Sequence, residues 1–190
     1  MSNPSADIEL VKKVKEGDTF AFRQLVEKYK DVSLTLACSI IKDGDAAQDV
    51  LQDAFMKVYA NIRKFKEKSS FSTWLYRIVV NTSFSALRKI KPYEEVEEVI
   101  EASQYSSEGV DVDLLHKVDQ EKYIKAALNR MKPEEALVIR LFYLCEFSIL
   151  EIKDVTDFSE SKIKVNLHRG RQNMFALLSR MLGNDLKELL

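Results

Sequence analysis

The sequence is poor in residues that interrupt helices and in residues that bind metals. Its 190 residues include only 5 Gly, 3 Pro, 2 Cys and 2 His, and so little Gly and Pro favours long, uninterrupted helices. Cys38 and Cys145 lie inside apolar helical patterns, and neither forms a metal-ligand spacing with His116 or His168. We therefore predict two buried thiols in a reducing compartment, and no metal site.

Signals for export, membrane insertion and catalysis are also missing. The N-terminal segment has no basic stretch followed by an apolar one, and no run approaches the roughly 18 apolar residues of a membrane span. The chain has no Gly-rich phosphate loop, no HExxH and no G-x-S-x-G. These absences predict a soluble cytoplasmic protein that is not an enzyme, with no catalytic residues, no cofactor and no small-molecule substrate.

The net charge of −1 conceals an uneven distribution. Residues 1–91 carry 16 Lys and Arg against 11 Asp and Glu, residues 92–115 carry 8 acidic and no basic residues, and residues 116–190 carry 13 against 11. A Ser-Ser-Glu-Gly cluster at 106–109 and weak periodicity predict a linker there, with a helical piece at 94–102 left open. We predict two domains, 1–91 and 114–190, joined by a flexible acidic linker at 92–113.

Apolar residues recur with a helical period almost throughout, and no segment carries a convincing strand pattern. The fold class expected is therefore all-α. The expected helices cover residues 6–15, 19–41 after an Asp18 cap, 46–63, 71–89, 114–130, 133–145, 148–155 and 160–182.

The segment 148–171 has the pattern of a helix-turn-helix. Ser159 is a candidate N-cap for the second helix, and Ile163, Leu167 and Met174 continue one apolar stripe. The opposite face is polar and basic, and such a helix fits the major groove of DNA. An ordinary amphipathic helix with a solvated basic face is the alternative.

Three motifs together give the chain a family resemblance. The segment Asp49–Phe55 (DVLQDAF) resembles a DVxQxxF helix, Phe71–Asn81 (FSTWLYRIVVN) resembles an FxTWLYRIaxN helix, and residues 151–171 resemble an EIA…S…VK…LhRaR pattern. In this order they resemble the extracytoplasmic-function (ECF, group 4) sigma factors of the sigma-70 family. The resemblance implies a sigma region 2 domain at 1–91 and a sigma region 4 domain, with the helix-turn-helix, at 114–190.

The DVLQDAF helix places carboxylate and amide side chains at spacings of three and four, so they share a face. The resemblance implies that this face binds the β′ clamp of core RNA polymerase and that the second domain contacts the β flap. A solvated acidic face at a helix start is the alternative. The candidate polymerase-binding residues are Asp49, Leu51, Gln52, Asp53 and Phe55.

The helix after Phe71 carries Arg77, Asn81, Ser85 and Arg88 on one outer face, next to a loop with cations and aromatic rings. Cations neutralise a DNA backbone and rings stack on unpaired bases. The resemblance implies that this region melts the −10 element and holds an extruded base, with Trp74 packed beneath. The candidate −10 residues are Phe65, Lys68, Ser69, Ser70, Phe71, Arg77, Asn81, Ser85 and Arg88, and a solvated face is the alternative for Arg77 and Asn81.

The resemblance assigns the −35 element to the second helix of the helix-turn-helix. Arg169 can bond guanine through two hydrogen bonds, whereas Val165 can contact only an apolar group such as a thymine methyl. Taken alone, His168 would more often be a surface histidine. The candidate −35 residues are Ser159, Lys162, Lys164, Val165, His168, Arg169 and Arg171.

The expected function is that of a sigma factor that directs core polymerase to promoter DNA. The resemblance also implies control by a membrane-associated anti-sigma factor, and a linker directed toward the RNA exit path. Asp157 replaces a turn glycine, which Asp tolerates, and Lys153 replaces a small residue, so its side chain should extend into solvent. A stand-alone dimeric helix-turn-helix regulator is the competing interpretation, but it leaves the two motifs of the first domain unexplained.

Overall fold

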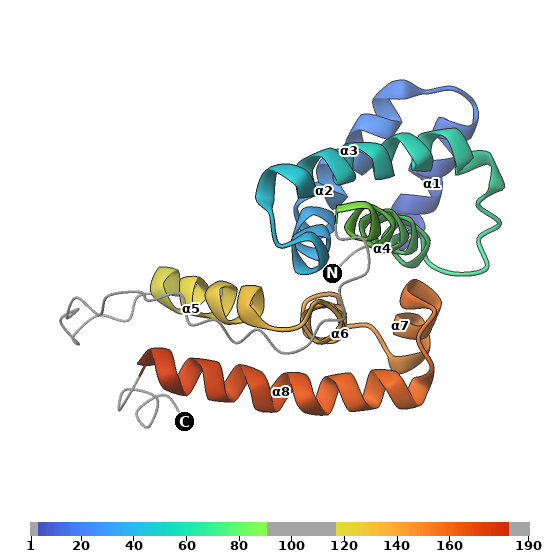
Figure 1. Ribbon diagram of the computed structural model, residues 1–190. Helices are drawn as coiled ribbons and strands as arrows, with labels where there is room; N and C mark the ends of the chain where they lie inside the picture. The colour runs from blue at the N-terminus through green and yellow to red at the C-terminus, as the bar shows by residue number, and fades with distance from the viewer. Residues whose placement is uncertain (1–3, 91–116, 183–190) are drawn as a thin grey trace.

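The structure is a computed structural model that describes residues 4–90 and 117–182. Within these ranges it contains helices and no strands, which confirms the all-α prediction (Figure 1). The elements are α1 (Pro4–Lys15), α2 (Thr19–Ile41), α3 (Gly44–Asn61), the 3₁₀ turn η1 (Ile62–Lys64), α4 (Phe71–Ile90), α5 (Lys117–Arg130), α6 (Pro133–Tyr143), α7 (Ile149–Thr156) and α8 (Glu160–Leu182). The predicted linker at 92–113, with its helical piece at 94–102, lies outside the described residues.

The helix ends follow from local capping signals. Asp18 accepts hydrogen bonds from the amides of Phe20 at 2.8 Å and Ala21 at 3.0 Å, so it starts α2 as predicted. The predicted Ser159 cap accepts from the Lys162 amide at 3.2 Å. Asp157 ends α7 with a φ of 58°, which confirms that an Asp can replace glycine in this turn.

In the first domain α1 to α4 surround one apolar core. Leu25 and Leu36 of α2 and Leu75 of α4 are almost completely buried. The N-terminal helix is fastened to α2 by the buried Asp7 carboxylate, which accepts from the Tyr29 hydroxyl at 2.5 Å and pairs with Lys28. This packing fixes the positions of α3 and α4 relative to each other. These two helices carry the candidate sites.

In the second domain α6 and α8 approach each other closely at Gly170. A Cβ atom there would lie 2.8 Å from Cγ1 of Ile139, which is buried in α6. Only a residue without a side chain fits this spacing unless Ile139 moves. Lys153, by contrast, is exposed, as its length predicted. Its Nζ lies 3.7 Å from Glu160 Oε1, a contact that was not predicted.

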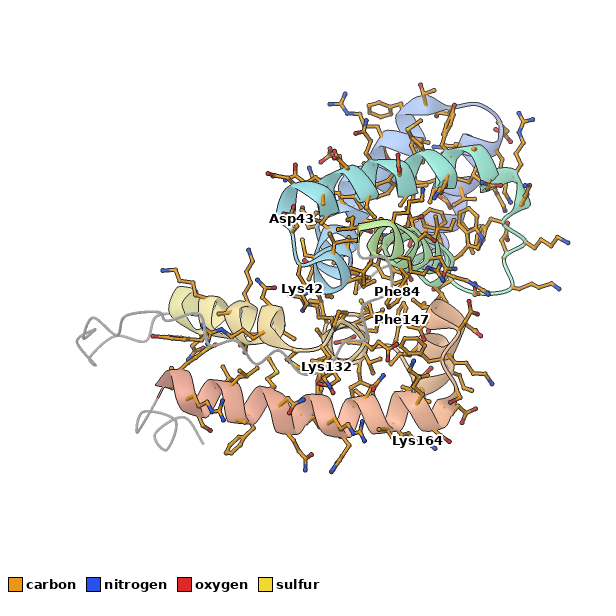
Figure 2. The ribbon with its side chains drawn as sticks, in the orientation of Figure 1. Lys42, Asp43, Phe84, Lys132, Phe147 and Lys164 are labelled. Atoms are coloured by element: carbon orange, nitrogen blue, oxygen red, sulfur yellow. The ribbon has the colours of Figure 1, made fainter. Side chains whose placement is uncertain are left out.

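The two domains pack against each other. Buried apolar side chains from both form one continuous cluster, and α2 faces α6 while α4 faces α7 (Figures 1 and 2). Cys38 and Cys145 are half-buried rather than fully buried, and both thiols are free. Burial raises the pKa of Cys145 to about 12. None of the helices in the described ranges is long and apolar enough to cross a lipid bilayer.

Candidate functional site

An apolar groove of about 860 Å³ runs between the first half of α2 and the helix α3. Among the predicted polymerase-binding residues, Leu51, Gln52 and Phe55 line this groove, and Asp49 and Asp53 are exposed on the same helix. The structure therefore places an apolar floor beside exposed carboxylates. We call this feature the α2–α3 groove.

Several residues of the α2–α3 groove were not identified from the sequence. Met56 and Tyr59 are 65% and 44% exposed although both are large and apolar, and Phe22 stacks on Tyr59 with ring centroids 4.8 Å apart. All three line the groove. The sequence does carry a signal for Met56 and Tyr59. They form a second apolar stripe on the DVLQDAF helix, in addition to the stripe that faces the core.

A second, polar cavity of about 410 Å³ lies between α3 and α4. Asn81 and Ser85, two of the predicted −10 residues, line it. Its wall holds four further polar residues that are not among the predicted −10 residues, namely Lys57, Asn61, Lys64 and Thr82. We call this feature the α4 cavity.

Hydrogen bonds orient the cations of the α4 cavity. Lys57 Nζ donates to Thr82 Oγ1 at 3.2 Å, and Lys64 Nζ donates to Asn61 Oδ1 at 2.8 Å. The cavity thus offers ammonium and amide groups beside the half-buried ring of Trp74. Such a combination can hydrogen-bond a base edge while it neutralises a phosphate.

The loop at 65–70 has buried rings and an exposed tip. Phe65 and Phe71 are 4% and 3% exposed and pack on Trp74, with ring centroids 5.3 and 6.0 Å away. Their rings support the loop in this conformation and do not offer a free face to a base. Ser70 caps α4 by accepting from the Thr73 amide at 3.1 Å, whereas Lys68 and Ser69 are exposed, as a DNA-contacting surface requires.

The predicted outer face of α4 is present. Arg77, Asn81, Ser85 and Arg88 are all exposed. Ser85 donates to the Asn81 carbonyl at 2.8 Å, and Arg77 Nη2 lies 2.8 Å from Asp157 Oδ1 of the second domain. The structure therefore brings these residues together but engages one of them in an ion pair between the domains.

Helix α8 presents the predicted base-contacting residues to solvent. Lys164, Val165, His168 and Arg169 are exposed, and Lys164 lies on the side of the second domain away from the first (Figure 2). The helix starts directly after Ser159, whose hydroxyl accepts from the Lys162 amide, and the positive end of a helix dipole favours an anion.

Two predicted phosphate-contacting residues are held by neighbours in their own domain. Lys162 pairs with Glu134 at 2.8 Å and lies 4.1 Å from the centre of the Phe158 ring. Arg171 donates from Nε to the Tyr143 hydroxyl at 2.8 Å. These contacts fix the directions of the two cations along the face of α8.

The described residues form an all-helical protein whose second domain contains a helix-turn-helix, and comparisons with known families specify it further. Residues 25–92 match Sigma-70 region 2, and residues 121–174 match Sigma-70, region 4. The chain is 31% identical over 170 residues to the ECF RNA polymerase sigma factor SigW of Bacillus subtilis, covering 85% of this chain and 91% of that protein. It is 29% identical over 180 residues to the ECF RNA polymerase sigma-E factor of Escherichia coli, covering 90% and 94%.

Solved structures of related proteins agree with these family matches. The sigma factor RpoE, in complex with the anti-sigma factor NepR from Bartonella quintana, matches with a TM-score of 0.61 and 25% identity over 83% of this chain and 96% of that one. CnrH, in complex with the cytosolic domain of CnrY, has the same fold, with a TM-score of 0.64 and 21% identity over 92% and 98% of the two chains. The chain belongs to the ECF RNA polymerase sigma factors of the sigma-70 family. Members of this family are transcription initiation factors and not enzymes.

Proposed function

We propose that this sigma factor, of group 4, uses three separate surfaces to bring core RNA polymerase to a promoter. The α2–α3 groove binds polymerase, the α4 face and α4 cavity bind the −10 element, and α8 reads the −35 element. The observation that carries the proposal is that the three surfaces are built from separate sets of side chains, so that no residue lining the α2–α3 groove is shared with the α4 cavity or with the exposed face of α8. The proposed domains are 1–91 and 114–190, with the linker 92–113 directed toward the RNA exit path.

The α2–α3 groove suits the β′ clamp because of its shape and charge. An apolar groove with exposed Met56 and Tyr59 can take the apolar face of an amphipathic helix. Exposed Asp49 and Asp53 can pair with cations that flank such a face. The second domain would contact the β flap at the same time.

The α4 cavity suits an extruded base of the −10 element. Asn81 and Asn61 can hydrogen-bond a base edge, and the exposed Lys68 and Arg88 can neutralise the single-stranded backbone. Binding the base there offsets part of the few kcal/mol lost when it leaves the stack. The buried Phe65 and Phe71 rings would act from beneath by holding the loop.

The recognition helix suits the major groove of the −35 element. Arg169 would bond a guanine, and Val165 would contact a thymine methyl. Lys164 and His168 extend the same exposed face. Lys162, Arg171 and the start of α8 at Ser159 would contact phosphates and so fix the register. We also propose that a membrane-associated anti-sigma factor controls the protein in the cytoplasm, in line with the complex of the sigma factor RpoE with the anti-sigma factor NepR.

A reconstituted transcription reaction tests the proposed function. The full chain is mixed with bacterial core RNA polymerase and a genomic fragment library, and the 5′ ends of the transcripts are sequenced. We expect new start sites that share one pair of −35 and −10 sequences. Discrete DNA binding without polymerase, and no new transcripts, would instead identify a stand-alone regulator.

A pair of variants tests the polymerase surface in the same reaction. Met56→Asp places a charge in the α2–α3 groove, and Leu150→Asp places one at an equally exposed leucine of α7, outside the groove. We expect Met56→Asp to weaken binding to core polymerase and Leu150→Asp to leave it unchanged. Equal binding by the two variants would show that polymerase does not occupy this groove.

A further inference from the structure

The function proposed above leaves the first helix of the chain without a role. Helix α1 carries none of the candidate residues, and it precedes residues 25–92, the part of the first domain that matches Sigma-70 region 2. It nevertheless contacts η1 and α4, the two elements that the loop at 65–70 connects (Figure 1). The contacts between α1 and this loop therefore indicate what the helix does.

The C-terminal end of α1 has a fixed position. Val11 and Val14 are buried in the apolar core of the first domain. Gly17 adopts a φ of 102°, its amide donates to the Val14 carbonyl at 3.0 Å, and the Asp18 amide donates to the Lys13 carbonyl at 3.0 Å. This pair of hydrogen bonds is a glycine-based helix stop that leads directly into α2. The last residue of α1 is therefore held in one place.

That last residue, Lys15, extends to the loop at 65–70. Its Nζ donates to the Phe65 carbonyl at 2.9 Å and lies 3.8 Å from Oε1 of Glu67. The same ammonium lies 5.7 Å from the centre of the Phe65 ring. The Lys15 side chain is only 26% exposed, so these contacts are partly shielded from water. One side chain of α1 thus holds both the start and the middle of the loop.

The loop needs such support because its backbone is strained. Glu67 adopts a φ of 58°, a left-handed conformation that is unfavourable for a residue with a side chain. A conformation of this kind persists only where the surrounding contacts hold it. The ammonium of Lys15 provides two such contacts, one to the Glu67 carboxylate and one to the Phe65 carbonyl two residues earlier.

The other end of the loop is also connected to α1. The Asp7 carboxylate accepts from the Tyr29 hydroxyl, and the Tyr29 ring packs edge-on to Phe71, with centroids 5.6 Å apart. Phe71 is the first residue of α4, and its ring packs on Phe65 at 5.8 Å. Helix α1 therefore supports both rings that close the loop, Phe65 directly through Lys15 and Phe71 through Tyr29.

These contacts extend to the α4 cavity. Phe65 directly follows Lys64 in the chain, and its ring packs on Trp74 with centroids 5.3 Å apart. Lys64 and Trp74 both line the cavity, whereas Lys15 does not. A shift of the Phe65 backbone would therefore move two residues of the cavity wall. Lys15 can affect a bound base only by positioning these residues.

We propose that Lys15 is a positioning residue for −10 recognition, which sets the base selectivity of the α4 cavity by fixing Phe65 and Glu67 in the loop. This inference rests on the proposed function of the α4 cavity. The preferred base binds well only when the cavity wall is in place, so its apparent affinity falls with the fraction of molecules that have this loop conformation. A mobile loop also accepts bases that a fixed wall excludes.

A matched set of full-chain variants separates positioning from the loss of a charge. Lys15→Met keeps the apolar stem and removes every donor, whereas Lys15→Arg keeps a charged donor for the carbonyl and the carboxylate. Glu67→Gln removes only the ion pair. Lys12→Met repeats the lysine-to-methionine change at an exposed position of the same helix. Thermal unfolding verifies that each variant folds.

Two measurements are made on each variant. Each is combined with core RNA polymerase on a pool of promoters that differ at single −10 positions, and the ratio of transcripts from the preferred and the other bases gives the discrimination at each position. Brief digestion of the free chain with trypsin, followed by mass spectrometry, gives the rate of cleavage after Lys66 and Lys68 in the loop. The second measurement reports the order of the loop without any DNA.

We expect Lys15→Met to lower the discrimination at one −10 position about three- to tenfold, because a partly shielded bond from a charged donor is lost. Its loop should also be cleaved faster. Lys15→Arg should recover most of both properties. Glu67→Gln should change the discrimination less than about twofold, since the carboxylate is exposed and the ion pair is long. Lys12→Met should discriminate between bases as the wild type does.

The outcomes that would overturn the proposal are distinct from a failure of the proposed function. A loss of one charge weakens binding to every sequence equally. Transcription that falls by the same factor for all bases in Lys15→Met, unchanged discrimination, or a loss that Lys15→Arg does not recover would each overturn it. A wild type that shows no base preference at any −10 position would refute the proposed function of the α4 cavity. The cleavage rates would still decide whether Lys15 orders the loop.

Discussion

Replacing Gly170 with alanine should destabilise the second domain although alanine is the better helix former. Gly170 lies inside α8, where Gly to Ala normally gains up to about 1 kcal/mol. Here the new Cβ would meet Ile139 Cγ1 at 2.8 Å and Cδ1 at 3.2 Å, and Met131 Cε at 3.4 Å. Ile139 is 4% exposed in the middle of α6, so it cannot turn away into solvent.

The expected loss of stability in Gly170→Ala follows from these two opposing effects. Forcing one carbon into a packed core costs about 1–3 kcal/mol, and the helix gain offsets up to about 1 kcal/mol of it. We therefore expect a net loss of about 1 kcal/mol, which lowers the Tm by about 2–4 °C for a chain of this size. The assay is thermal unfolding followed by circular dichroism at a fixed protein concentration.

A matched glycine provides the control. Gly44 is at the start of α3, and a Cβ built there meets no atom within 4 Å. Gly44→Ala should therefore leave the Tm unchanged or raise it slightly. A higher Tm for Gly170→Ala as well would refute the reasoning, because it would show that α6 and α8 separate at almost no cost.

The parts of this structure that depend on neighbouring residues could be predicted from the sequence. Asp18 and Ser159 are caps because a short polar side chain precedes an apolar helical pattern, and such a signal is complete within four residues. The face formed by Arg77, Asn81 and Ser85 follows from helical spacing alone. The same local information predicted that Asp157 would tolerate its turn.

The parts that depend on distant residues could not be predicted. Arg140 donates to the Thr35 carbonyl from 105 positions away, and Arg77 pairs with Asp157 from 80 positions away, so periodicity carries no information about either contact. For the same reason the composition of the loop predicts that Phe65 faces DNA, whereas its ring is turned into the core. Which ring of a loop points inward is decided by the helices that enclose it, and not by the loop itself.

Two further predictions concern single charged residues. Arg169→Ala should relax sequence choice at one −35 position by about 1–3 kcal/mol, measured as run-off transcription from promoters mutated at that position, while Arg180→Ala, exposed at the end of α8, should leave discrimination intact. The other concerns pH and the contact between the two domains, where Lys42 Nζ donates to the Leu128 carbonyl at 2.8 Å. Burial of the Lys42 ammonium, with repulsion from Arg140, lowers the pKa of Lys42 to about 8 from an ordinary value of 10.5. The packed arrangement of the two domains therefore disfavours the charged form. Its penalty is fully present below pH 8 and is relieved as the pH rises from 8 toward 10.5. Because Lys42 as a whole residue is exposed, solvent screening makes the gain smaller than the full shift would give. Small-angle X-ray scattering should show a more compact chain at pH 9.5 than at pH 7, and Lys42→Met, which keeps the apolar stem without the charge, should be equally compact at both. A wild type that opens as the pH rises would contradict this sign, because it would mean that the charged ammonium holds the domains together.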